Sequence, residues 1–288
     1  MARFYCTYNS ETSTSLNLSL RIELLQNACS KLAIPCFAMD QAKADFSSLP
    51  VLSNNDGLYN CSRGSYLLEN ALLNTEVRTF YRNFNFLSIK DDNGILQSEL
   101  ERNGVSCPRS VHCGTNDRGL LNKYQEQLNG FPLILKVYGH SGGVGVILIE
   151  SFAALISTAD HLKKQGVNFQ LKEFIAAETV ERATVLGDKV LYCISRKIPK
   201  QDFRTNYFEE EKQLITLDSE AEKLAVKASH ACNYNFAGVD MIWDKKTQKW
   251  MVLEVNFPQN FAAHEIDFNT ACSEHMLKWL FKPNKKSL

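Results

Sequence analysis

Two acids and an amide near the end of the chain form the strongest candidate for a chemical site. Glu254 and Asn256 are two residues apart in a predicted strand, so their side chains share one face. If the turn of the predicted hairpin centres on Thr247, Asp240 lies directly opposite Glu254. Facing like charges beside apolar residues are unfavourable unless a cation joins them. Two carboxylates and an amide oxygen suit Mg²⁺, and a solvated hairpin face is the alternative.

A glycine-rich segment follows the strand that is predicted over residues 131–137. From Tyr138 to Val146 it holds four glycines, which let backbone N–H groups approach phosphate oxygens closely. Lys136 would add a positive charge against the phosphates. No Gly-Lys-Ser/Thr follows and a strand comes next, which excludes a Walker loop and a dinucleotide fingerprint. A glycine-rich hairpin over nucleotide phosphates remains, and a flexible turn is the alternative.

A third group of polar residues lies between residues 195 and 206. Arg196, Arg204 and Asn206 belong to it. Guanidinium groups in fixed positions stabilise phosphoryl oxygens where negative charge builds up during transfer. The alternative is a surface loop with ordinary basic residues. The sequence has no Ser-His-Asp order and no His-Glu-x-x-His spacing, so hydrolase and zinc-protease functions lack support.

The elements that must position these residues follow from apolar periodicity. A strand, a helix and a strand are expected at residues 3–8, 16–32 and 35–39, which indicates a small α/β unit. Ser219 and Glu222 have the spacing of a capping box that opens a helix to about Asn233. The other main expectations are strands at 131–137, 146–149, 169–175, 183–186 and 190–195, helices at 66–73, 91–103, 152–164 and 274–281, and a hairpin from 241–244 to 250–255.

Composition and charge bound the class of protein. The 288 residues are 44% hydrophobic and 22% charged, as in ordinary globular proteins. Acidic and basic side chains number 32 each, which gives no overall field to attract nucleic acid or an anionic membrane. Nine scattered cysteines without a Cys-x-x-Cys pair indicate reduced thiols and a cytoplasmic location. No apolar run approaches the roughly 20 residues of a membrane helix.

Six short motifs occur in an order that resembles the ATP-grasp superfamily, in particular its RimK-type ribosomal-protein glutamate ligases. They lie at residues 131–136, 142–146, 172–175, 203–206, 237–240 and 253–256. The resemblance implies an α/β (α+β) fold, the ATP-grasp fold, with antiparallel sheets. Its implied parts are an N-terminal α/β substrate domain at 1–90, a central subdomain with a glycine flap at 91–175, and a C-terminal subdomain with the metal site at 176–288.

The resemblance also implies roles for individual residues. Arg196 and Arg204 would be catalytic, and Asp240, Glu254 and Asn256 would bind Mg²⁺, with Mn²⁺ as a substitute. The implied ATP-binding residues are Lys136, Gly142, Gly143, Val144, Gly145, Glu173, Phe174, Ile175, Glu178, Glu181, Arg204 and Asn206. Two departures stand out. Asn93, with Lys90 one turn earlier, occupies the place of a second ATP-binding lysine, and Val180 replaces an acid two residues before Arg182.

The implied reaction is ATP-dependent ligation of a carboxylate to an amine through an acyl phosphate. The alternatives are a phosphotransferase and a non-catalytic ATP-binding module on the same nucleotide site. The expected partners are ATP and an amino acid, peptide or protein, without nucleic acid or membrane. The first ~100 residues match the family least, so the substrate stays open, as does the oligomeric state. Arg63 and Arg78 are candidates for gripping a carboxylate or are surface residues.

Overall fold

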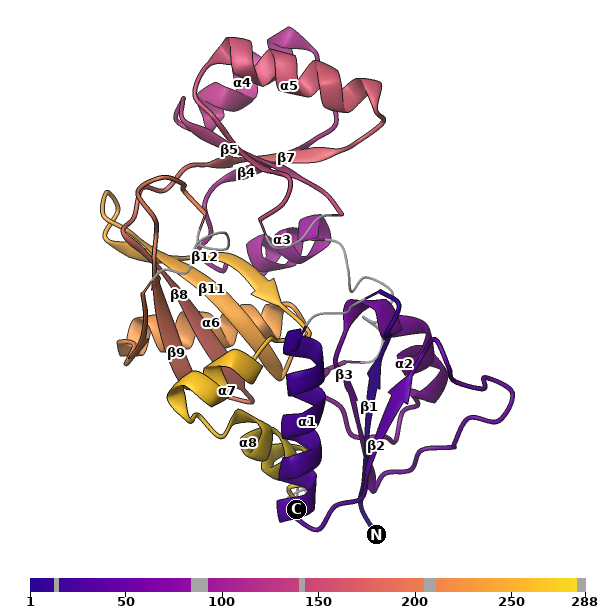
Figure 1. The fold of residues 1–288 in the computed structure, drawn as a ribbon. Coiled ribbons are helices and arrows are strands. Elements are labelled where there is room, and N and C mark those ends of the chain that lie inside the picture. The colour runs from indigo at the N-terminus through magenta and orange to yellow at the C-terminus, as the bar shows by residue number, and fades with distance from the viewer. Residues whose placement is uncertain (13–15, 84–92, 140–142, 205–210, 284–288) are drawn as a thin grey trace.

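Three β-sheets follow one another along the chain. The computed structural model describes residues 1–12, 16–83, 93–139, 143–204 and 211–283, and all three sheets lie within these ranges. Figure 1 shows the sheet of residues 110–173, here called the lid, above the other two. The mixed α/β architecture with two antiparallel sheets confirms the predicted fold class.

The N-terminal sheet is parallel, in the order β2-β1-β3. Parallel strands need a crossover connection, and helix α1 provides it between β1 and β2. The predicted strand-helix-strand unit is thereby confirmed. Helix α1 also packs against the last helix, α8, and Figure 1 shows it between the parallel sheet and the C-terminal helices. The elements are β1 Arg3–Tyr8, α1 Leu16–Lys31, β2 Cys36–Asp40, β3 Asp56–Asn60, the 3₁₀ turn η1 Arg63–Ser65 and α2 Tyr66–Leu72.

The lid is an antiparallel sheet, in the order β4-β7-β5-β6, with two helices on one face. Alternation along β5 buries Leu133, Leu135 and Val137 against those helices. It therefore leaves Ile134 and Lys136 on the opposite face, toward the rest of the chain. The elements are β4 Ser110–Cys113, α4 Arg118–Gln127, β5 Leu133–Val137, β6 Val146–Ile149, α5 Phe152–Lys164 and β7 Phe169–Glu173.

The third sheet is antiparallel and has five strands, in the order β10-β9-β8-β11-β12. Helix α6 packs on one of its faces, and helix α3 contacts β12 and α6. The other face is turned toward the lid. The elements are α3 Asn93–Arg102, β8 Thr179–Leu186, β9 Lys189–Lys197, β10 Lys212–Ile215, α6 Ser219–Ala231, β11 Phe236–Asp244, β12 Lys249–Asn256, α7 Ala262–Phe268 and α8 Cys272–Leu280.

The start of helix α6 differs from the predicted capping box. Ser219 is the first helical residue, and the cap is Asp218. The Asp218 carboxylate accepts hydrogen bonds from the backbone N–H groups of Glu220 and Ala221 at 2.9 and 2.8 Å. A carboxylate at this position satisfies two otherwise unpaired donors and also suits the positive end of the helix dipole. The capping box is therefore wrong by one residue, while the helix is confirmed.

A β-bulge sets the pairing of β11 with β12. Asp244 pairs with Lys249, so the turn is not centred on Thr247 as the sequence analysis assumed. Without a correction, that register would place Leu253 opposite Asp240. The register shifts between Asp240 and Met241, which makes Leu253 the extra residue of the bulge. Asp240 therefore faces Glu254, and the predicted pairing is confirmed although the assumed turn centre is wrong.

The parallel sheet and the five-stranded sheet share one hydrophobic core. Phe236 on β11 is fully buried, and its ring lies 6.1 Å from Tyr59, 5.4 Å from Phe80 and 6.1 Å from Phe261. The lid has a separate core beneath α4 and α5. The two lower sheets therefore pack as one body, and the lid is a distinct apolar unit. No helix in the described ranges has the length and apolar character needed to span a membrane.

Replacing Phe236 with alanine should lower the free energy of unfolding by about 3–5 kcal/mol, because it leaves a cavity where three elements meet. Urea denaturation followed by circular dichroism measures this change. The matched control is Phe46→Ala, since Phe46 is 48% exposed, and its effect should stay below about 0.5 kcal/mol. Equal effects of the two variants would contradict a core shared through Phe236.

Candidate active site

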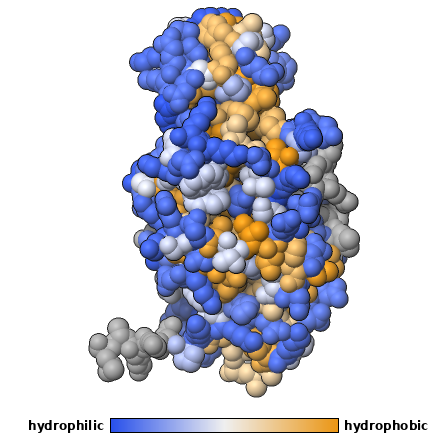
Figure 2. Space-filling model, turned by 90° about the vertical axis from the view of Figure 1, so that its left-hand side faces the viewer, coloured by the Kyte–Doolittle hydropathy of each residue, from blue (hydrophilic) through white to orange (hydrophobic). Residues whose placement is uncertain are grey.

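A cavity of about 750 Å³ lies between the lid and the open face of the five-stranded sheet. Ile134, Lys136 and Val146 line it from the lid, and Asp240 and Glu254 line it from the sheet. Figure 2 shows the lid as the narrower upper lobe, with apolar surface that continues to its junction with the body. The volume is in the range of small-molecule sites.

One end of the cavity is apolar. Ile175, Val180 and Ile242 form a buried cluster there, with Ile198 and Leu253 packed against it. All five of these side chains line the cavity. Of these five, Leu253 is the extra residue of the β11–β12 bulge, and Ile175 lies just after β7, the last strand of the lid. A flat apolar ring that entered this end would bury its apolar surface away from water, which favours its binding there.

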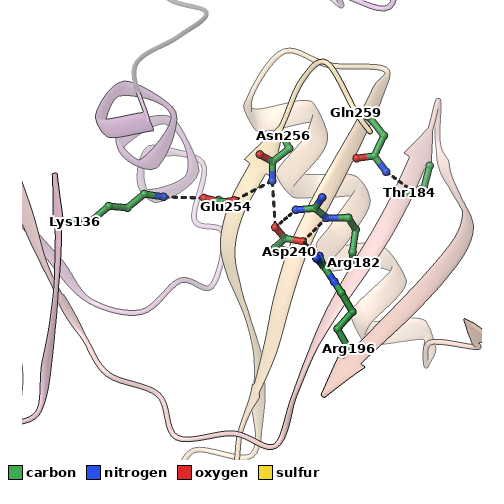
Figure 3. A network of polar contacts seen from close by, with 8 residues as sticks. All are labelled: Lys136, Arg182, Thr184, Arg196, Asp240, Glu254, Asn256 and Gln259. Carbon is green, nitrogen blue, oxygen red and sulfur yellow. Dashed lines mark hydrogen bonds and ion pairs between the residues drawn. The ribbon is translucent and has the colours of Figure 1, made fainter. Parts of the chain in front are cut away.

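The neighbouring part of the same sheet face carries a row of charges, drawn in Figure 3. Arg182 on β8, Asp240 on β11 and Glu254 on β12 stand side by side in register. Arg182 Nε donates to Asp240 Oδ1 at 2.6 Å, and its Nη2 donates to Oδ2. Arg196 Nη2 adds a longer contact to Asp240 Oδ1 at 3.4 Å. Asp240 is thus held by two guanidinium groups from β8 and β9.

Glu254 is held from the other side by the lid. Lys136 Nζ donates to Glu254 Oε2 at 2.7 Å. The positive charge of Lys136 is the first cause that holds the pKa of Glu254 well below its ordinary value. Asn256 Nδ2 connects the two acids, because it donates to Asp240 Oδ2 at 3.2 Å and to Glu254 Oε1 at 3.1 Å. The three predicted metal ligands therefore meet at one place.

These three residues fit a hard divalent cation. Carboxylate and amide oxygens are its preferred ligands. The Asn256 amide lies between the two acids with its nitrogen toward them, and a half-turn of the amide group would bring its oxygen to the same place. Within the described ranges no group of three or more acidic, histidine or cysteine side chains is placed to hold a metal. A cation at this site would therefore depend on the amide oxygen of Asn256 and on ligands from water or a substrate. Mg²⁺ commonly takes such mixed ligand sets.

Most of the other predicted site residues also border the cavity. Gly143, Val144, Glu173, Phe174, Ile175 and Arg204 line it. Arg204 Nη1 donates to the Gly143 carbonyl at 3.3 Å, and its Nη2 pairs with Asp202 at 2.7 Å, so this arginine connects two walls. Gly145 sits at the end of the glycine turn, where its carbonyl accepts from Val137 N–H at 2.9 Å. Gly142 and Asn206 lie outside the described residues.

The two acids expected to hold a ribose are not brought to the cavity. Glu178 has an 81% exposed side chain and pairs with Lys245. Glu181 alternates with the inward-facing Val180 and Arg182, so its side chain lies on the opposite face of β8. There it accepts from Thr179 Oγ1 at 2.7 Å, and burial raises its pKa.

Two cations of the cavity region, the largely buried Arg182 and the buried Lys172, were missed as site residues. Arg182 fell outside the strand predicted from Ala183, and β8 begins earlier, at Thr179. Lys172 lines the cavity from β7 and is 7% exposed. The available signal was a charged residue inside a β-branched or apolar strand, since such residues are rarely buried without a partner. The sequence pattern does not show which residue pairs with the buried charge.

Replacing Arg182 with methionine should lower the free energy of unfolding by about 3–5 kcal/mol, because it leaves the buried Asp240 carboxylate without its main partner. Chemical denaturation measures the change. The control is Arg118→Met, whose partner Asp160 and own side chain are 39% and 52% exposed. Water screens this exposed pair, so its loss should change the stability far less. A loss no larger than the control's would contradict the buried pair.

The sequence that forms this site matches a known family. A profile of the RimK-like ATP-grasp domain matches residues 97–280. The chain is 30% identical over 194 residues to a probable alpha-L-glutamate ligase 2 of Hahella chejuensis, an alignment that covers 65% of this chain and 62% of that protein. It is 31% identical over 187 residues to a probable alpha-L-glutamate ligase of Histophilus somni, covering 61% of each. The chain thus spans about six tenths of these relatives' length.

Solved structures share the fold over nearly the whole chain. The ATP-grasp ligase PsnB, complexed with a minimal precursor, aligns with a TM-score of 0.70 at 14% identity, covering 96% of this chain and 99% of that one. A D-alanine–D-alanine ligase from Bacillus anthracis, complexed with ATP, aligns with a TM-score of 0.69 at 16% identity, covering 97% of each. On the family match and this shared fold, the chain belongs to the RimK-like ATP-grasp family.

Proposed function

We propose that this protein is an ATP- and Mg²⁺-dependent ligase that joins a carboxylate to an amine through an acyl phosphate. The observation that supports it most is that one sheet face has an apolar end and a charged end within a single cavity. Its apolar end, at Ile175, Val180 and Ile242, suits a nucleobase. Its charged end, at Lys136 and Glu254, suits phosphates with a metal ion.

In this proposal the nucleotide lies along that face beneath the glycine turn. Glu173, Phe174 and Ile175 contact the adenine, and Gly143 and Val144 cover the phosphates. Asp240, Glu254 and Asn256 hold Mg²⁺. The bound ion offsets negative charge on the phosphoryl oxygens. Lys136 lies within reach of the same oxygens, because it already contacts Glu254 at 2.7 Å.

The reaction proceeds in two displacements. A carboxylate oxygen of the substrate attacks the γ-phosphorus, the bond to the β-phosphate oxygen breaks, and ADP leaves. Arg196 and Arg204 offset the charge on the transferring group. An amine nitrogen then attacks the acyl carbon, phosphate leaves with the electron pair of the broken carbon–oxygen bond, and the amine loses a proton. The lid excludes water, which would hydrolyse the acyl phosphate.

The substrate is proposed to be an amino acid, a peptide or a protein. The curated relatives are named glutamate ligases, one solved neighbour is complexed with a precursor peptide, and another is a D-alanine–D-alanine ligase. We propose the division into a substrate part at 1–90, a central part at 91–175 and a metal-binding part at 176–288. Arg63 lines the cavity from the first part, which places a positive charge where a substrate carboxylate would enter.

Replacing Glu254 with glutamine should lower ADP release by about 10²–10³-fold, because it replaces a charged proposed metal ligand with a neutral one and removes the charge that orients Lys136. A coupled ADP-release assay over a panel of amino acids and peptides, at fixed Mg²⁺, measures it. The matched control is Glu23→Gln on the exposed side of α1, which should keep wild-type turnover. Full turnover by the Glu254 variant would refute the assignment.

Hydroxylamine should intercept the reaction as a hydroxamate of the carboxylate substrate, because hydroxylamine attacks acyl phosphates but not phosphate esters. Mass spectrometry of a reaction with ATP, Mg²⁺ and the active substrate detects it. A parallel reaction with the imido analogue of ATP should give none, since its β–γ bridge is not cleaved. A phosphorylated hydroxyl without hydroxamate would instead establish a phosphotransferase.

A further inference from the structure

A buried lysine without an assigned role lies in the roof of the cavity. Lys172 on β7 pairs in register with Ile134 on β5, while Lys136 pairs with Gln170. Both lysines therefore stand on the cavity face of the lid, one diagonal step apart. Lys172 lines the cavity and is only 7% exposed.

The contacts of Lys172 are neutral. Its Nζ donates to Gln97 Oε1 at 2.9 Å and to the Leu253 carbonyl at 3.3 Å. Within the described part of the chain no carboxylate lies within ion-pair distance of it, whereas Lys136 has Glu254 at 2.7 Å. Burial and then the charge of Lys136 lower the pKa of Lys172 to about 8. A buried ammonium with only neutral acceptors favours an anion beside it.

The position along the cavity indicates which anion. The Leu253 carbonyl belongs to the residue that packs on the apolar end, and Glu254 is the next residue toward the charged end. Lys172 therefore lies between the proposed nucleobase pocket and Lys136. In a nucleotide stretched along this face, the phosphates nearest the nucleoside would pass beneath it.

We propose that Lys172 binds the α- and β-phosphates of the nucleotide, while Lys136 binds nearer the transferred γ-phosphate. This inference rests on the proposed function, because it assigns a further residue to the same nucleotide site. The competing explanation is that Lys172 only fastens the lid to α3 and β12 through Gln97 and Leu253. A fastening role affects every ligand of the cavity alike, whereas a phosphate contact affects only phosphorylated ligands.

The test is a calorimetric affinity series with adenosine, AMP, ADP and the imido analogue of ATP at fixed Mg²⁺. Lys172→Met should bind adenosine as the wild type does and bind ADP about 10- to 100-fold more weakly, without a further loss for the triphosphate. Lys136→Met should show its largest loss with the triphosphate. Lys172→Arg should recover part of the ADP affinity. Lys163→Met, an exposed lysine of the same lid, is the control and should match the wild type.

The outcomes separate the two proposals. If Lys172→Met binds the whole series like the wild type, or loses adenosine as strongly as ADP, the lysine does not bind phosphate, and the proposed ligase stands. If the wild type binds none of the nucleotides, both proposals fail. Should the methionine variant not fold, Lys172→Gln preserves a hydrogen bond toward Gln97 and answers the same question.

Discussion

The rest of the structure depends on two acids, Asp240 and Glu254, that stand opposite each other on neighbouring strands. Such a pair is unfavourable without compensating charge. The compensation comes from three directions: Arg182 and Arg196 rise from adjacent strands, and Lys136 descends from the lid. The lid is therefore connected to the body through the same charges that would bind a metal and a nucleotide. Its placement and the state of the site are physically linked.

One sheet face carries both halves of the cavity because alternation repeats along neighbouring strands. On β8, Val180 and Arg182 point the same way, and on β11, Ile242 and Asp240 do so. Stacking these pairs in register puts apolar side chains in one row and charged ones in the next. A ligand with an apolar end and a charged end, such as a nucleotide, matches that order. The sheet face itself therefore supplies an apolar and a charged end for such a ligand.

The sequence predicted what local patterns determine. Periodicity predicts the helix at 152–164, which has these bounds, and the strand at 131–137, which begins at Leu133. The pairing of Asp240 with Glu254 was predicted from a turn centre that is wrong, and it is present because of the β-bulge. It could not predict partners brought in from distant segments, such as Arg182 for Asp240, 58 residues away. The bulge at Leu253 was also invisible, because nothing in the local composition marks which residue of a hairpin is extra. Glu178 and Glu181 were predicted because they follow the hinge segment closely in the sequence. Their side chains point away from the cavity, which the sequence distance does not show.

At the bulge, the main chain and the side chain of Leu253 contact different parts of the structure. Its carbonyl receives the lid lysine, while its side chain packs on the apolar end of the cavity. The main-chain oxygen is present whatever the side chain is. Substitutions at this position would therefore reshape the proposed nucleobase pocket, and with it the selectivity for the base, while the hydrogen bond from Lys172 to the main chain persists. At this one residue, the shape of the apolar end depends on the side chain, and the hydrogen bond to the lid depends on the main chain.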